Sequence, residues 1–184
     1  IMHFAQQNAP TGVSLYPKDQ EQSVRSWESR FDNGFGIKCR VWAYIYLQEA
    51  PEIIHEILSQ GTPSEYRFLK PVVPQALNAI VRLYKAYPHR LHRIEKELEA
   101  LLDQCDFMLR DQRPFFMGNH FSAVDITLGA LAGVLVLPPE YGFRYPDLKN
   151  YPEAMQQRIL QWRERPVGQY ILRMYANHRT SFSV

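Results

Sequence analysis

Hydrophobic residues recur with helical spacing along almost the whole chain. In the stretch 19–49, Trp27, Phe31 and Ile45 fall along one side of a helix, with Phe35 and Trp42 beside them. The stretch 88–111 is the most regular, because an apolar stripe lies opposite a run of charged residues. No run alternates apolar and polar residues between glycine or asparagine turns, as a half-buried strand would. The pattern therefore predicts an all-α protein.

Prolines and polar residues divide this pattern into separate helices. Pro51, Pro88 and Pro166 stand where a new periodic stretch begins, a position that proline tolerates. Residues 1–8 are typical of the end of an earlier helix, and residues 9–18 of a linker. We predict helices over 19–49, 51–61, 63–87, 88–111, 122–137, 152–164 and 166–177.

Two of these helices contain residues that weaken a helix. Gly34 and Gly36 each cost up to about 1 kcal/mol relative to alanine, so we expect a break or close packing there. Pro71 and Pro74 lie inside 63–87, where a proline costs about 3 kcal/mol or more by removing a backbone hydrogen bond. A kink or a restart near Lys70 is the expected result.

The helix predicted at 122–137 carries no charge after its first turn. The uncharged run from Ile126 to Pro139 is shorter than the roughly 20 apolar residues of a membrane span. It is better explained as a helix buried on all sides at the centre of a bundle. Small residues would let the neighbouring helices approach closely: Gly129, Ala130, Ala132 and Gly133.

The start of this helix has the signature of a capping box. Ser122 is a favourable N-cap, and Asp125 stands three residues later, where its carboxylate can reach back to the N–H of Ser122. Phe121 and Ile126 flank the cap as a hydrophobic staple would. We interpret Ser122 and Asp125 as a structural cap, a folding device from which no chemistry follows.

Composition narrows the class of protein. The chain has 184 residues, 46% of them hydrophobic and 22% charged, which is typical of a globular domain. A net charge of +2 is too weak to indicate a nucleic-acid partner. Two cysteines form no disulfide framework and no metal motif, and no signal peptide is visible, so we expect a cytoplasmic protein without a metal. We expect that this sequence begins partway through a longer protein.

A wider string resembles a known family. Residues 115–128 read Phe-Phe-Met-Gly-Asn-His-Phe-Ser-Ala-Val-Asp-Ile-Thr-Leu. This string is similar to the glutathione transferase pattern of an aromatic or aliphatic pair, Met or Leu, Gly, a polar pair, Phe-Ser/Thr-x-Ala/Val-Asp and an apolar helix. The segments 151–153 and 162–168 resemble the late helices of that family, and residues 1–5 resemble the end of its N-terminal domain.

The resemblance implies a division into two parts. Residues 1–18 would be a remnant of the thioredoxin-like N-terminal domain with its linker, and residues 19–184 the glutathione S-transferase C-terminal-like helical bundle around a buried central helix. The family's catalytic Ser, Tyr or Cys and its glutathione-binding residues belong to the N-terminal domain, and none can be located here. We therefore assign no catalytic residue. Pro71, Pro74 and the loop at 138–150 are not general features of the family.

The resemblance also implies a function. Such a domain lines the pocket for a small hydrophobic electrophile, which is conjugated to glutathione as co-substrate in detoxification. The first half of the helix at 19–49 would face this pocket, which makes Trp27, Phe31, Phe35 and Lys38 the candidate substrate-binding residues. The competing interpretation places the three aromatic rings in the core and Lys38 in solvent. The family implies a homodimer, and we expect neither a nucleic-acid partner nor a membrane span.

Other candidates have simpler structural interpretations. Cys39 and Cys105 fall among apolar helical positions, where packing is a better explanation than redox chemistry. His89 and His92 share a helix face without an evident third ligand, so we interpret them as surface residues. The aromatic residues of the 138–150 loop either cover a pocket mouth or pin the loop: Tyr141, Phe143 and Tyr145.

Two further functions compete with conjugation. Helical domains of this type also act as non-catalytic interaction or assembly modules, which predicts a stable oligomer without transferase activity. A ligand carrier that uses the same apolar cleft is the third hypothesis.

Overall fold

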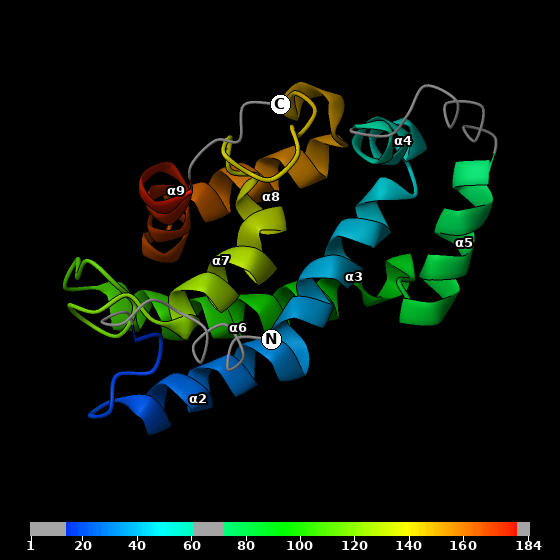
Figure 1. Ribbon diagram of the computed structural model, residues 1–184. Helices are drawn as coiled ribbons and strands as arrows, with labels where there is room; N and C mark the ends of the chain where they lie inside the picture. The colour runs from blue at the N-terminus through cyan, green and yellow to red at the C-terminus, as the bar shows by residue number, and fades with distance from the viewer. Residues whose placement is uncertain (1–13, 61–71, 180–184) are drawn as a thin grey trace.

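The computed structural model describes residues 14–60 and 72–179. It confirms the all-α prediction, because extended pairing in these residues is limited to one isolated bridge between Phe115 and Gly118. The helices, labelled in Figure 1, are α2 (Glu21–Arg30), α3 (Gly36–Leu47), α4 (Pro51–Ser59), α5 (Val73–Tyr84), α6 (Leu91–Leu109), α7 (Ala123–Val136), α8 (Glu153–Glu164) and α9 (Pro166–His178). The helix predicted at 1–8 lies outside the described residues, and the division into 1–18 and 19–184 stays a prediction.

The helix predicted at 19–49 is present as α2 and α3, joined by a π-helical turn at Phe31–Phe35. The backbone leaves helical geometry at Asn33 and Gly34, so the expected break lies there. At Gly36 the structure has close helix packing, the other result expected for these glycines. A Cβ atom added to it would lie 2.6 Å from the side chain of Leu131, so its lack of a side chain lets α3 pack closely on α7.

The second half of the chain forms the remainder of the bundle. α7 crosses the middle of the molecule, with α2 and α3 on one side and α8 and α9 on the other (Figure 1). Its N-cap is Ser122, as predicted, and ten of its residues are buried, among them Val124, Leu128 and Ala132. The central packing expected for this helix is therefore confirmed.

The expectation that this helix is buried on all sides is wrong. Ile126 is 37% exposed, and Ala130, one turn further along, is exposed as well. The two side chains lie on one face because they are four residues apart. No described helix covers that face, so the central helix keeps an apolar strip at the surface.

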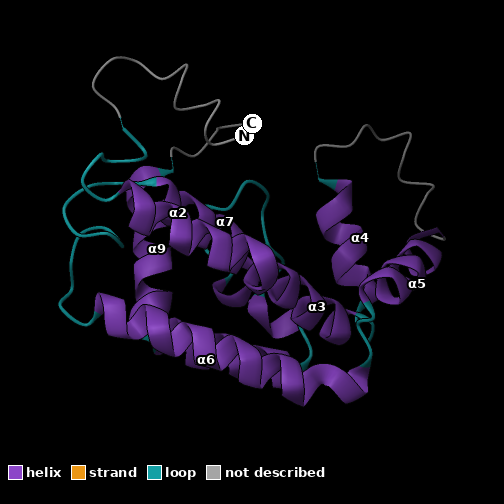
Figure 2. Ribbon diagram, turned by 90° about the horizontal axis from the view of Figure 1, so that it is seen from below, coloured by secondary structure: helices purple, strands orange, loops and turns teal. Residues whose placement is uncertain are grey.

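Pro74 lies at the start of a helix, as the restart expected near Lys70 would place it. α5 begins at Val73, so Pro74 lies in its first turn, where a missing backbone N–H leaves no helical bond unmade. Pro71 and the helix predicted from residue 63 lie outside the described residues. α5 ends at Tyr84, and the next residue, Lys85, adopts the left-handed conformation. Figure 2 shows α4 and α5 together at one end of the bundle, next to the end of α3.

A polar network ties α6 to the junction between α8 and α9. The guanidinium of Arg165 binds the carboxylates of Glu99, Asp103 and Asp106. The indole N–H of Trp162 donates to Glu99 Oε1 at 2.7 Å. Arg165 is only 19% exposed, so these contacts replace water that the guanidinium gives up on folding.

Candidate functional site

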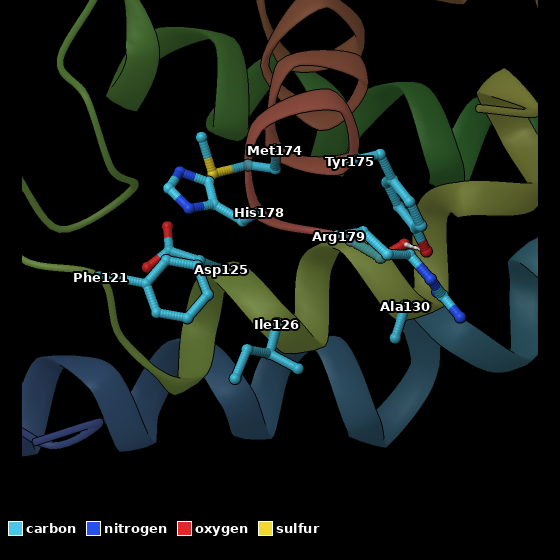
Figure 3. Close-up of a pocket in the computed structure, with 9 residues that line it drawn as sticks. Phe121, Asp125, Ile126, Ala130, Met174, Tyr175, His178 and Arg179 are labelled. Carbon is cyan, nitrogen blue, oxygen red and sulfur yellow. Dashed lines mark hydrogen bonds between the residues drawn. The ribbon is translucent and has the colours of Figure 1, made fainter. Parts of the chain in front are cut away.

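A groove of about 400 Å³ lies between α7 and α9, along the exposed strip of the central helix (Figure 3). Ile126 and Ala130 contribute apolar side chains from α7, and Met174 contributes one from α9. We call this feature the α7–α9 groove. Its lining residues are Phe121, Asp125, Ile126, Gly129, Ala130, Met174, Tyr175, His178 and Arg179. Small apolar side chains with a few polar groups at the edges are the usual lining of a ligand site.

Asp125 lies at one end of the groove, and its carboxylate is fully occupied. Oδ1 accepts from the N–H of Phe116 at 2.7 Å and from the hydroxyl of Tyr170. Oδ2 accepts from the N–H of Ser122 at 2.6 Å and from the Ser122 hydroxyl at 2.9 Å. These bonds confirm the predicted capping box. Because four donors surround this carboxylate, its role is to hold α7, the loop before it and α9 together.

The environment of Tyr170 also indicates that Asp125 has a structural role. Burial, followed by the neighbouring charge of Asp125, raises the pKa of this phenol far above its usual value. The hydroxyl therefore stays protonated at physiological pH and remains a donor to Asp125. The bond joins α9 to the first turn of α7, which fixes the angle between the two helices that form the groove.

Arg179 lies at the other end of the groove, held by aromatic rings. Its guanidinium carbon is 5.5 Å from the ring centre of Tyr141 and 5.6 Å from that of Tyr175. Gly142 leaves room for it, because a Cβ atom there would lie 2.5 Å from the Arg179 Nη2 atom. Burial raises the pKa of Tyr175 to about 12, and its hydroxyl donates to the Gly129 carbonyl oxygen at 3.2 Å.

His178 and Phe121 form the wall near Asp125. Their rings are 5.4 Å apart, and Phe115 contacts both, with centroid distances of 5.5 Å to Phe121 and 5.6 Å to His178. The end of α9 therefore packs on the connection that precedes α7. In the described part of the chain no group of three or more His, Cys, Asp or Glu side chains is arranged to hold a metal ion.

The substrate-binding residues predicted from the sequence lie elsewhere. Phe31 and Phe35 are buried in the core, and Trp27, half-buried, packs edge-on against Phe116 at 4.9 Å. Lys38 forms an ion pair with Glu97 at 3.4 Å. Phe35 and Lys38 line a second, more polar hollow of about 450 Å³ beside α6, and Phe31 and Trp27 line neither cavity. Their role in binding stays a prediction.

The cysteines and His89, the other candidates from the sequence, lie in the core and at the surface respectively. Cys39 and Cys105 are free and buried, and burial raises the pKa of both thiols, that of Cys105 to about 12. His89 is exposed and stacks on Tyr87 at 5.7 Å.

The loop aromatics gather at the Arg179 end of the groove. Tyr141 stacks on Tyr175 at 5.7 Å, while Phe143 and Tyr145 pack against Tyr141 and against each other. The backbone of Arg144 is held at both its N–H and its carbonyl by the side chain of Gln60. The loop is therefore pinned by these contacts, one of the two roles that the sequence left open.

Sequence reasoning assigned none of the groove residues to binding, and the clearest omissions are Met174, Tyr175 and Arg179. They belong to the last helix and its end, where the pattern shows an amphipathic helix without indicating which neighbour it faces. The available signal was Gly129 and Gly133, since small residues on the central helix indicate a close neighbour. These glycines predict that some helix packs closely on the central helix, but they do not identify that helix as α9.

The fold and the groove define a class: an all-helical domain built around a capped central helix, with one apolar face open to a ligand or a partner. Residues 88–165, which include α6, α7 and α8, match the family model described as glutathione S-transferase, C-terminal domain. This part of the chain is thus similar to the C-terminal domain of glutathione S-transferases. It matches no curated protein and no solved structure in the comparisons. None of the described helices is both long and apolar enough to cross a membrane.

Proposed function

We propose that this chain is the second-substrate domain of a glutathione transferase-like protein. The α7–α9 groove would hold a small hydrophobic electrophile, while a thioredoxin-like domain binds the co-substrate glutathione. The observation that carries the proposal is the open apolar strip of Ile126 and Ala130 on a helix that is otherwise buried. An apolar surface kept open on a central helix is unfavourable in water, so a ligand or a second domain is expected to cover it.

The path of the chain supports this arrangement. The backbone carbonyl of Leu15 accepts a hydrogen bond from the N–H of Ala123 at 3.0 Å. The start of the described chain is therefore fixed beside the first turn of α7, next to the groove. A domain that precedes this point would be tethered close to the groove, and a cleft between two domains is a common place for a ligand.

The proposed reaction divides the work between the two domains. The glutathione sulfur forms a bond to an electrophilic carbon of the substrate, the bond to the leaving group breaks, and the thiol proton is released to solvent. Activation of the thiol belongs to the other domain. The groove contributes by holding the apolar part of the electrophile and keeping water from it.

The test is conjugation by the protein encoded in the complete reading frame. With 1-chloro-2,4-dinitrobenzene as electrophile, we expect thioether formation and a KM about tenfold higher in Ala130→Phe, whose ring would fill the groove. Ala100→Phe is the matched control, because Ala100 is also exposed but lines the hollow beside Lys38. A larger effect in the Ala100 variant would move the site to that hollow. Absence of conjugation would refute the proposal.

The alternative is a non-catalytic assembly module. Leu58 on α4 and Leu83 on α5 are 60% and 76% exposed, and exposed large apolar side chains often mark protein contacts. Light scattering with size-exclusion chromatography measures the oligomeric state, for which we propose a homodimer. A stable larger oligomer without conjugation would favour the assembly role.

A further inference from the structure

Resting on the proposed function, we infer that the α7–α9 groove selects an organic anion. The ligand would lay a flat apolar body along Ile126 and Ala130 and place a carboxylate at Arg179. The proposal therefore adds a charge to the substrate class: an aromatic carboxylate rather than any apolar electrophile.

Arg179 is suited to this role because its guanidinium is a positioned cation. Its guanidinium packs over the rings of Tyr141 and Tyr175, and Gly142 provides the space. Within 14–60 and 72–179, no carboxylate lies within ion-pair distance of it, whereas Arg165 has three. A guanidinium held by rings loses little freedom when it binds a carboxylate, and its planar donors match that group.

The groove itself is suited to a flat apolar body. Ala130 and Gly129 keep one side shallow, while Met174, which also lines the groove, supplies an adaptable thioether. The ring of Phe121 closes the far end. A volume of about 400 Å³ lies near the lower end of the range for ligand pockets, which favours a compact ligand of one or two rings.

The charges in the groove fix the orientation of such a ligand. Figure 3 shows Asp125 and Arg179 at opposite ends, with Ile126 between them and Ala130 on the Arg179 side. The Asp125 carboxylate already accepts four hydrogen bonds, so it has no donor to offer an anion and repels it. His178 lies beside Phe121, at the Asp125 end. An anionic head group is therefore favoured at the Arg179 end, and the apolar body points toward Phe121.

A matched pair of probes tests the inference on the 184-residue chain. Naphthalene-2-carboxylate carries the charge, and naphthalene-2-carboxamide has nearly the same shape without it. We expect titration calorimetry to show the acid binding about tenfold more tightly than the amide, as a charge-assisted contact at a partly exposed site would give. In Arg179→Met the acid should lose this advantage, while the affinity for the amide stays the same.

Two further variants locate the effect. Ala130→Phe should weaken both probes, because it fills the space that their rings share. Arg110→Met is the matched control, since Arg110 also lies over an aromatic ring, that of Phe107 at 4.1 Å, but outside the groove. It should leave both affinities unchanged. Circular dichroism spectra that match the parent chain would show that each variant is folded.

The outcomes separate the inference from the proposed function. Equal affinity for acid and amide, or a preference that survives in Arg179→Met, would overturn the anion site while leaving the electrophile groove standing. A clear preference for the acid that depends on Arg179, in a complete protein that conjugates nothing, would support the anion site and overturn the transferase proposal. Binding that Ala130→Phe does not weaken would overturn the location.

Discussion

Asp125 binds both local and distant segments of the chain. The sequence predicts its place in a cap, because a serine three residues earlier and an apolar helix afterwards are local features. The structure adds Phe116 and Tyr170 as donors, and these come from the preceding loop and from α9. No spacing in the sequence indicates such partners, since they depend on how distant segments pack.

Replacing Asp125 with asparagine should therefore destabilise the fold strongly. The amide has one acceptor oxygen, so donors of Ser122 would face an NH₂ group in a buried place. Each unsatisfied buried donor costs about 1–3 kcal/mol, and we expect a loss of about 3 kcal/mol in the free energy of unfolding. Urea denaturation measures it.

Asp147→Asn is the control for this prediction. Asp147 forms an exposed pair with Lys149 at 3.4 Å, and such pairs contribute only about 0–1 kcal/mol. If the two variants unfolded at the same urea concentration, the buried network around Asp125 would not have the role described.

The candidate residues Phe31, Phe35 and Lys38 show the limit of a helical stripe. Apolar periodicity identifies the buried side of a helix, and the two phenylalanines are buried. The same periodicity is expected for a residue that faces a ligand and for one that faces another helix. Whether Lys38 meets a ligand or Glu97 depends on the helix beside it, which the local pattern does not contain.

At the scale of elements, the prolines in the sequence predicted where helices begin. Pro51 and Pro166 lie in the first turns of α4 and α9, as predicted, because proline is compatible with the start of a helix. The open face of α7 could not be predicted. An uncharged helix without a strong polar side gives no sign of which face is left uncovered, and the answer depends on the angle at which α9 crosses it.

The junction between α8 and α9 supplies an element-scale prediction. A Cβ atom on Gly168 would overlap the backbone carbonyl oxygen of Trp162 and approach the Arg163 Cα atom to 3.0 Å. Because backbone must move, Gly168→Ala should destabilise the protein by about 2 kcal/mol, despite the helical preference of alanine. Thermal unfolding followed by circular dichroism measures the change.

Gly129→Ala is the comparison for that variant. The added Cβ atom would meet the Tyr175 ring at 3.6 Å, an ordinary contact. Its stability should stay the same or rise by up to about 1 kcal/mol, because alanine favours a helix. A Gly168 variant as stable as this one would show that α8 and α9 are not packed as tightly as described.

For the whole molecule, the sequence predicted the class of fold and the central helix, but not the site. The groove joins Ile126 and Ala130 to Tyr175 and Arg179, which are more than forty residues further along the chain. Its existence depends on the crossing of two helices and on a loop that packs its aromatic rings at one end. The family resemblance supplied an expected cleft, and the structure supplied the residues that line one.

The buried thiols predict how the stability of the whole molecule depends on pH. The unfolded chain loses its thiol protons near pH 8.5, whereas the folded chain keeps that of Cys105 until about pH 12. Above pH 8.5 the unfolded state therefore binds fewer protons, and the free energy of unfolding falls as pH rises. Urea midpoints at pH 7, 8, 9 and 10 should decline, and the decline should be smaller in Cys105→Ala. A flat profile would contradict burial of the thiols.

The most direct test of the account is to locate a bound ligand on the folded chain by NMR. Methyl groups of Ile126, Ala130 and Met174 report on the α7–α9 groove, and those of Leu101 report on the hollow beside Lys38. On titration with S-(2,4-dinitrophenyl)glutathione, the product of the proposed reaction, we predict shifts at the three groove residues and none at Leu101. Shifts at Leu101 with an unchanged groove would contradict the central claim that the open face of α7 is the binding surface.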